Sequence, residues 1–460
     1  MAGDDLPQPY DAKALAPAKK RQRSNSPSGS EQPRKLKRPG QRARITDAQR
    51  EELRQRAIER EREQAAAAAQ TDHQRAAIND VVRAHYNSVP ERGRDWRKTD
   101  SRIKGLRSFN NWVKSCIIQK FAPDEDHTPG AFERGISSGR ELLILDIGCG
   151  KGGDLGKWQQ APQTVELYVG LDPADISIDQ AKERYRGMAQ RDRHGGRGGR
   201  GGGPYRRPQP RLFEARFHVK DCFGETIEDI DIVRQVGFTQ SNISGDRGFD
   251  VVSMMFCMHY AFETEAKARQ MLKNVAGSLK KGGRFIGTIP NSDVIGERVR
   301  EFNEKQKAKA EKAEDPKADE AKEDGETEEG EEKEEGEAEE TAEWGNEIYR
   351  VRFPGKTPED GIFRPPFGWK YSFFLHEAVE EVPEYVVPWE AFRALAEDYN
   401  LELQYHKSFS DIWDTEKDDP TLGPLSERMG VRERGGGELL VSPEEMEAAA
   451  FYVGFCFYKV

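Results

Sequence analysis

Residues 142–154 read LLILDIGCGKGGD, an apolar run of strand length that leads directly into a glycine-rich turn. Comparable apolar runs follow at Val165–Asp172, Arg216–Asp221, Phe249–Phe256 and Gly283–Pro290. Helical patterns are expected to begin near Asp154, Ser177, Glu263 and Asp293. Strands that alternate with helices predict βαβ units around a parallel sheet. We therefore expect an α/β fold with a Rossmann-like, doubly wound and mostly parallel sheet.

The C-terminal part of the chain continues this pattern. Leu401–Phe409 and Phe451–Val460 are apolar runs that we assign as the last two members of a seven-stranded sheet, and Pro388–Asn400 is expected to be helical. The strands expected at Asn346–Phe353 and Lys370–Leu375 are assigned to a small antiparallel patch beside that sheet.

Charge is distributed unevenly over the 460 residues, of which 33% are charged and 35% hydrophobic. Residues 1–64 contain 16 Lys/Arg and 10 Asp/Glu, whereas residues 304–343 contain 7 Lys and 19 Asp/Glu. Such segments bury too little apolar surface to fold. We expect a disordered basic tail over 1–64 and one domain over 65–460. Two insertions interrupt this domain: a Gly/Arg-rich loop at 191–211 and an acidic disordered insertion at 304–343. The Gly/Arg-rich loop either contacts RNA weakly or is only a flexible connection.

Two basic clusters in the tail, Lys19–Arg23 and Arg34–Arg38, are typical of a nuclear import signal or of an arm that touches RNA weakly, although a purely solvated tail would look the same. We therefore expect the protein in the nucleus. No apolar run approaches the roughly 18 residues of a membrane-spanning helix. Five cysteines without a C-x-x-C pair argue against a disulfide framework or a zinc site. The sequence thus predicts neither a membrane-spanning segment nor a metal site.

The glycine-rich turn has two competing interpretations. Gly148, Gly150 and Gly153 match G-x-G-x-x-G, and Asp172 lies 19 residues further on, as in a crude dinucleotide-binding fingerprint. Asp146, two positions before the first glycine, would repel a pyrophosphate but suits the ammonium and sulfonium of S-adenosylmethionine. The glycines, in particular Gly148 and Gly150, would then let the backbone come close to the amino-acid part of this cofactor.

Three acids follow successive expected strands. Asp146 ends the first, Asp172 ends the second, where it is placed for the ribose hydroxyls, and Asp221 ends the third, beside the adenine. In doubly wound sheets the carboxyl ends of the strands converge on one ligand crevice. Each acid taken alone could equally cap a turn or helix; together with the glycine turn they favour a cofactor site.

At this point the sequence resembles the eukaryotic, fungal-type mRNA cap guanine-N7 methyltransferases, a class I S-adenosylmethionine-dependent family. The matching segments are Arg107–Ser115 (RSFNNWVKS), Leu145–Lys157 (LDIGCGKGGDLGK), Phe256–Glu263 (FCMHYAFE), Gly287–Ser292 (GTIPNS), Val382–Val387 (VPEYVV) and the strand around Tyr452. The resemblance covers roughly Val81–Phe302 and Glu347–Val460. It implies methyl transfer from S-adenosylmethionine to N7 of the terminal guanosine of 5′-capped RNA, with the transcription machinery as a candidate partner.

The resemblance also implies site residues. The cofactor contacts that it carries over are Lys114, Gly148, Asp172, Asp221 and Tyr260. Met255 stands where the family usually has Gln, so we expect weaker cofactor affinity, although its backbone can still make the contact. The cap contacts that it carries over are Asn110, Asn111, Lys151, Asp154, Arg184, His259, Glu384 and Tyr452.

The residues themselves leave alternatives open. Lys151 and Arg184 could screen a triphosphate, but Lys151 could also be a solvated loop lysine, and His259 a structural cap. Glu384 lies in an apolar setting where an unpaired carboxylate is costly, and a guanine edge would supply a partner. Tyr452 could equally belong to the core, and Asn110-Asn111 to a simple turn.

The expected chemistry needs no catalytic base. Guanine N7 already carries an in-plane lone pair, so catalysis should come from in-line positioning and electrostatics. Two rivals remain: a methyltransferase for a non-RNA substrate, against which FNNWVKS and His259-Tyr260 argue, and an inactive cap- or RNA-binding scaffold, which Met255 and the basic tail would support.

Overall fold

The computed structural model describes residues 80–88, 96, 99–124, 127, 140–195, 211–238, 247–314 and 340–460. The two basic clusters and most of both expected insertions lie outside these residues. Residues 80–88 form a helix. The domain boundaries expected from the sequence therefore stay a prediction.

A seven-stranded sheet carries the fold, in the order β10-β11-β5-β4-β1-β2-β3. Its strands are β1 (Leu142–Ile147), β2 (Val165–Asp172), β3 (Glu214–Val219), β4 (Phe249–Met255), β5 (Leu279–Pro290), β10 (Leu401–Ser408) and β11 (Tyr452–Lys459). Neighbouring strands from β3 to β5 pair in parallel, whereas β11 is antiparallel to both β5 and β10. The expected mostly parallel, seven-stranded sheet is confirmed.

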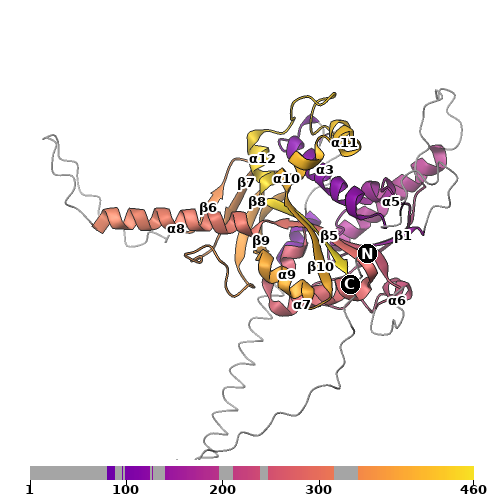
Figure 1. Ribbon diagram of the computed structural model, residues 1–460, viewed down its shortest axis with the longest axis horizontal. Coiled ribbons are helices and arrows are strands. Elements are labelled where there is room, and N and C mark those ends of the chain that lie inside the picture. Colours follow the sequence, from indigo (N-terminus) through magenta and orange to yellow (C-terminus); the bar gives the residue numbers. More distant parts are fainter. Residues whose placement is uncertain are drawn as a thin grey trace, which may run out of the picture. The chain divides into compact units, whose positions relative to one another are not determined.

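Helices cover both faces of this sheet (Figure 1). One buried cluster draws side chains from α3 (Lys104–Phe121), α4 (Leu155–Gln159), α5 (Asp175–Gly195), α8 (Ser292–Glu314), α10 (Phe409–Glu416), α11 (Leu422–Met429) and α12 (Pro443–Ala450). A second cluster draws on α6 (Asp231–Val236), the 3₁₀ turn η1 (Met258–Glu263), α7 (Glu265–Ser278) and α9 (Trp389–Glu397). Because both faces are covered, every residue of β4 is buried, as is usual for a central parallel strand.

A second, antiparallel sheet has the order β6-β7-β8-β9. Its strands are β6 (Glu343–Gly345), β7 (Tyr349–Arg352), β8 (Lys370–Leu375) and β9 (Val379–Tyr385). The antiparallel patch is confirmed, but the sequence indicated only β7 and β8. Pro383 concealed β9, because proline cannot donate to a central ladder; it is accommodated here on an edge strand.

Helices extend into the first residues of both expected insertions. Helix α5 continues to Gly195, within the loop expected over 191–211, and α8 continues to Glu314, within the acidic insertion expected over 304–343. Ala, Lys and Glu are strong helix formers, so α8 continues from its buried first turns into a polar stretch. Lys309 forms an ion pair with Glu340 at 3.1 Å, on the far side of the acidic run. These corrections leave 196–210 and 315–339 outside the described residues.

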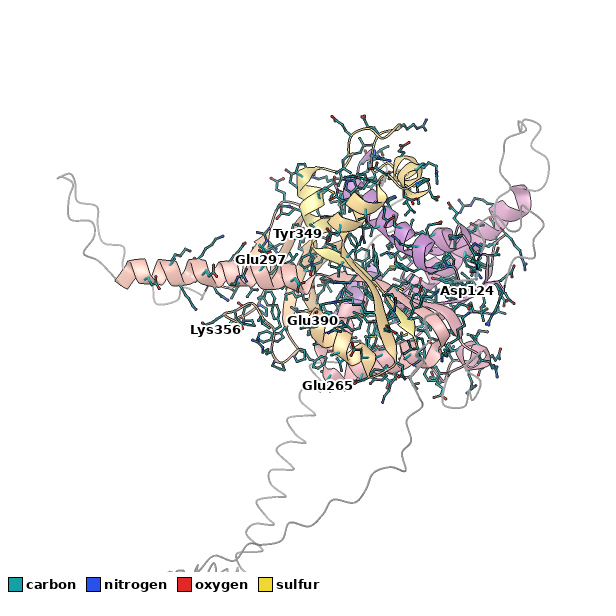
Figure 2. The ribbon with its side chains drawn as sticks, viewed as in Figure 1. Asp124, Glu265, Glu297, Tyr349, Lys356 and Glu390 are labelled. Atoms are coloured by element: carbon teal, nitrogen blue, oxygen red, sulfur yellow. The ribbon has the colours of Figure 1, made fainter. Side chains whose placement is uncertain are left out.

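Helix α3 is fixed at its C-terminal end and in its middle. Arg284 donates to the carbonyl of Phe121 at 3.0 Å and to Asp124 at 2.8 Å, just beyond the helix C-terminus (Asp124 is labelled in Figure 2). Trp112 donates its indole N–H to the carbonyl of Leu422 at 2.9 Å, which joins α3 to α11. The helix that carries Asn110, Asn111 and Lys114 is therefore held rigidly against the sheet.

Candidate active site

The glycine turn between β1 and α4 adopts the conformation that only glycine accepts readily. Gly148 and Gly150 have φ of 72° and 51°. A Cβ on Gly148 would lie 2.5 Å from the Cys257 sulfur, whereas one on Gly150 would meet no atom within 4 Å. Gly148 is thus needed for close packing beneath the turn, and Gly150 leaves open space above it. This open backbone fits the approach of a cofactor.

Asp172 is fixed beside this turn. One carboxylate oxygen accepts from the Gly150 amide and the other from the Ala174 amide, both at 2.9 Å. The pKa of Asp172 is raised overall, because the effect of burial outweighs that of these two amides, which lower it. The end of β2 therefore presents a held carboxylate next to the open face of the glycine turn, as the cofactor-site prediction requires.

Asp221 lies two residues beyond the end of β3 rather than at its last position. Its carboxylate accepts from the amides of Phe223 at 2.9 Å and Gly224 at 3.2 Å, so it does stabilise a local turn. It also lines a pocket of about 590 Å³ together with Arg83 and Pro173. Both interpretations of Asp221 are thus compatible, and its contact with the cofactor stays a prediction.

Asp146 differs from the expectation of an open acid at the crevice. Only 2% of it is exposed, and its two oxygens accept from Tyr168 and from Ser253, each at 2.6 Å. Burial and the nearby charge of Asp154 raise the pKa of Asp146 to about 7. The side chain is therefore enclosed by neighbouring strands, and direct cofactor binding by Asp146 stays a prediction.

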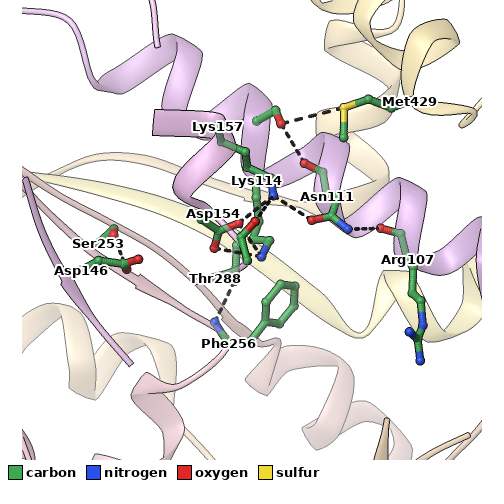
Figure 3. A network of polar contacts seen from close by, with 12 residues as sticks. Arg107, Asn111, Lys114, Asp146, Asp154, Lys157, Ser253, Phe256, Thr288 and Met429 are labelled. Carbon is green, nitrogen blue, oxygen red and sulfur yellow. Dashed lines mark hydrogen bonds and ion pairs between the residues drawn. The ribbon is translucent and has the colours of Figure 1, made fainter. Parts of the chain in front are cut away.

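A charged network joins α3 to α4 (Figure 3). Asp154 pairs with Lys114 at 2.8 Å and with Lys157 at 2.7 Å, and Lys157 also donates to Asn111 at 2.7 Å. Burial alone would raise the pKa of Asp154, but the two lysines outweigh it and lower that pKa; burial lowers the pKa of Lys157. One predicted cofactor residue, Lys114, is thereby linked to two predicted cap residues.

Lys157 is a functional candidate that the sequence reasoning missed. It was quoted only as the last residue of the glycine motif, and its position three residues after Asp154 on α4 was the available signal. Helical residues three apart lie on one face, so an Asp-x-x-Lys spacing predicts a contact.

His259 and Glu384 are buried beside aromatic side chains, among them Tyr260 and Tyr371. The His259 ring nitrogen lies 3.4 Å from a Glu384 oxygen, and side chains of the pair are only 3% and 5% exposed. Tyr371 donates to the other Glu384 oxygen at 2.8 Å. Neither ring nitrogen of His259 has a hydrogen-bond partner among the residues that the structure describes. Burial, and then the charge of Glu384, raise the pKa of Tyr452, so this carboxylate interacts electrostatically with Tyr452.

The helix at 80–88 contributes to the same region. The hydroxyls of Tyr86 and Tyr260 lie 2.9 Å apart, and Asn87 donates to Asp175 at 2.9 Å. Tyr260, a predicted cofactor residue, is therefore covered by a residue that the sequence did not single out. No spacing motif marked Tyr86, because only the fold brings it to η1.

The remaining predicted residues lie in three different places. Asn110, Asn111, Gly150 and Lys151 line a cleft of about 1290 Å³. Arg184 lies on α5, and its charge contributes to lowering the pKa of Lys157. Met255 is 8% exposed and packs in the first hydrophobic cluster; its weaker cofactor binding stays a prediction.

All five cysteines are buried free thiols. Among the residues placed by the structure, no group of three or more His, Cys, Asp or Glu could hold a metal ion. Within the same part of the chain, no helix combines the length and apolar character needed to cross a membrane.

Comparison with known proteins agrees with this geometry. The model of the mRNA (guanine-N(7))-methyltransferase domain matches residues 69–312 and 328–460. A Pyricularia oryzae mRNA cap guanine-N(7) methyltransferase is 73% identical over 451 residues, covering 98% of this chain and 91% of that protein. Proteins of the same name from Aspergillus fumigatus and Schizosaccharomyces pombe are 60% and 41% identical, covering 95% and 83% of this chain and 65% and 82% of theirs. The chain therefore belongs to the mRNA (guanine-N(7))-methyltransferase family and is an S-adenosylmethionine-dependent methyltransferase, as its sequence motifs predicted.

Proposed function

We propose that the enzyme holds the cap guanine between His259 and Glu384 and methylates N7 by positioning, without removing a proton. The incompletely bonded His259–Glu384 pair is the observation that carries this proposal. Buried polar groups normally have hydrogen-bond partners, and a buried carboxylate without enough of them is costly. A ligand with both donors and acceptors on one flat edge would satisfy the pair.

Guanine has such an edge. Its N1–H and exocyclic amine donate, which suits the Glu384 oxygen that faces His259 at 3.4 Å. The aromatic rings of Phe256 and Tyr452, whose centroids are 4.9 Å apart, are proposed to offer flat surfaces to the base. After transfer the base carries a positive charge, which the carboxylate of Glu384 also stabilises.

The residues of the glycine turn fit the cofactor. The open backbone at Gly150 and the fixed carboxylate of Asp172 suit its amino-acid and ribose parts, and Lys114 suits its carboxylate. When bound, S-adenosylmethionine supplies a sulfonium methyl group. The Lys114 ammonium, which lies 2.8 Å from an Asp154 oxygen, would then be shared between Asp154 and the cofactor. Asp146, Asp221, Met255 and Tyr260 complete the proposed cofactor set.

The transfer needs alignment more than acid or base chemistry. Guanine N7 donates its lone pair to the methyl carbon as the carbon–sulfur bond breaks, so one bond forms, one breaks and the positive charge moves to the purine. Lys151 and Arg184 are proposed to screen the cap triphosphate, and Asn110, Asn111 and Asp154 to contact the cap elsewhere. Fixing both reactants removes much of the entropic barrier of a bimolecular step.

We also propose that the enzyme acts on capped transcripts in the nucleus, near the transcription machinery. The basic clusters at 19–23 and 34–38 support nuclear import.

The test is methyl transfer from labelled S-adenosylmethionine to capped and uncapped RNA of the same sequence. We expect label at guanine N7 in the capped RNA alone. Glu384→Gln should lower kcat/KM for the cap by about 10- to 100-fold, since a charge-assisted hydrogen bond contributes about 1.5–3 kcal/mol, and leave cofactor affinity unchanged. Glu380→Gln, an exposed residue on the same strand, is the control. Equal labelling of uncapped RNA, or cofactor binding without turnover, would contradict the proposal and favour a rival function.

A further inference from the structure

The cleft of about 1290 Å³ extends well beyond the glycine turn. One side is formed by α3, whose lining residues run along most of the helix: Lys104, Leu106, Arg107, Ser108, Asn110, Asn111, Ser115, Ile118 and Gln119. The other side is formed by α11, through Thr421, Leu425, Arg428 and Met429. Ser115 approaches the Met429 sulfur at 3.9 Å, which marks where the two helices meet. The cleft therefore lies between α3 and α11 and is called here the α3–α11 groove.

The groove is positively charged in a chain of net charge −10. Its lining holds five basic side chains, Lys104, Arg107, Lys151, Lys157 and Arg428, against two acidic ones, Glu377 and Glu427. Glu377 is tied to Arg107 at 3.7 Å. Lys104 and Arg428 are exposed and stand on opposite walls. This distribution favours a polyanion lying between the walls.

The groove includes part of the proposed cap site, because Asn110, Asn111 and Lys151 belong to its lining. Gly150 and Lys151 of the glycine turn belong to the same lining as Lys104 and Arg428. From Lys104 to Gln119 the helix rises about 22 Å at about 1.5 Å per residue. At about 3.4 Å per stacked nucleotide this length accommodates roughly six nucleotides. A chain leaving the triphosphate at Lys151 would thus enter the groove directly.

We propose that the α3–α11 groove binds the first nucleotides of the RNA chain behind the cap, through their sugar-phosphate backbone. This rests on the proposed function, because the cap must be bound as described for the chain to enter there. Among the described residues of the lining, Tyr86 is the only aromatic one, so stacking contributes little and the basic side chains would follow the sugar-phosphate backbone. The binding is therefore independent of base sequence and sensitive to salt.

The test compares the cap dinucleotide GpppG with a capped octanucleotide on the full chain, using Lys104→Gln/Arg428→Gln. For the parent, KM should be lower for the octanucleotide at low salt, and this advantage should shrink as salt rises. In the double variant, the slope of log KM against log salt should fall by about 1.4, because each lost contact to single-stranded RNA removes about 0.7. The octanucleotide advantage should fall on the order of tenfold at 0.1 M salt.

Arg434→Gln is the matched control, since Arg434 is exposed just beyond α11 and outside the groove lining. It should leave the octanucleotide advantage intact. An unchanged slope in the double variant, or equal losses for both substrates, would overturn the groove assignment, as would equal competition by polyglutamate and by an uncapped octanucleotide. Failure of the parent to methylate GpppG at all would instead contradict the proposed function.

Discussion

Asp154→Asn should be among the most destabilising conservative changes near the active site. The Asp154 carboxylate holds two ammonium groups, Lys114 at 2.8 Å and Lys157 at 2.7 Å, and the three side chains are only 11–14% exposed. Removing one partner of a buried pair leaves uncompensated buried charge and costs about 3–5 kcal/mol. Asn keeps the size of Asp, so lost packing contributes little. We therefore expect the free energy of unfolding to fall by about 3–5 kcal/mol.

Lys157→Met should cost much less, about 1 kcal/mol, because Asp154 keeps Lys114 and because burial already disfavours the charged form of Lys157. The double variant Asp154→Asn/Lys157→Met leaves only Lys114 without its counter-charge. The double variant should therefore lose less free energy of unfolding than the two single variants together, by about 1–3 kcal/mol.

Urea unfolding followed by circular dichroism measures these differences, provided that the m-value is unchanged. Asp179→Asn is the control, because Asp179 and Lys182 form an exposed pair on α5, 77% and 39% exposed, and such pairs contribute at most about 1 kcal/mol. If Asp154→Asn destabilised no more than this control, or if the two substitutions were additive, the network would not be a coupled buried cluster and our reasoning would be wrong.

Three further outcomes can be checked. The folded-state pKa of Asp146, about 7 against an ordinary 3.8, means that its neutral form stabilises the fold fully below about pH 4 and that this contribution is lost as the pH rises through 7. As the pH rises over that range, the free energy of unfolding of the parent should thus fall by up to about 4 kcal/mol relative to that of Asp146→Asn. A difference between the two proteins that does not depend on pH would refute this. Gly148→Ala should abolish cofactor binding in calorimetric titration, because its Cβ meets Cys257 at 2.5 Å, whereas Gly150→Ala, with no atom within 4 Å, should weaken it less; the reverse order would contradict the assignment. Replacing 315–339 by a Gly-Ser linker should leave methyl transfer within about twofold, because these residues are too charged to pack, and a large fall with normal folding would reveal a regulatory role.

Local chemistry in the sequence determined much of this molecule. Apolar runs before LDIGCGKGG and at Val165–Asp172 specified buried parallel strands, because period and length suffice for that inference. The glycine turn was readable because only glycine tolerates the positive φ that Gly148 and Gly150 adopt. The family motifs identified the chemistry because they are contiguous in sequence.

Only the tertiary structure decided the contacts between distant segments. Asp146 was expected to face a ligand, but neighbouring strands place Tyr168 and Ser253 on its two oxygens. Tyr86 reaches Tyr260 across 174 positions, and His259 meets Glu384 only after β9 pairs with β8. The α3–α11 groove likewise exists only where two helices far apart in sequence come together. Sequence patterns report each residue's local preference, whereas burial and pairing of charged groups depend on what the whole fold brings beside them.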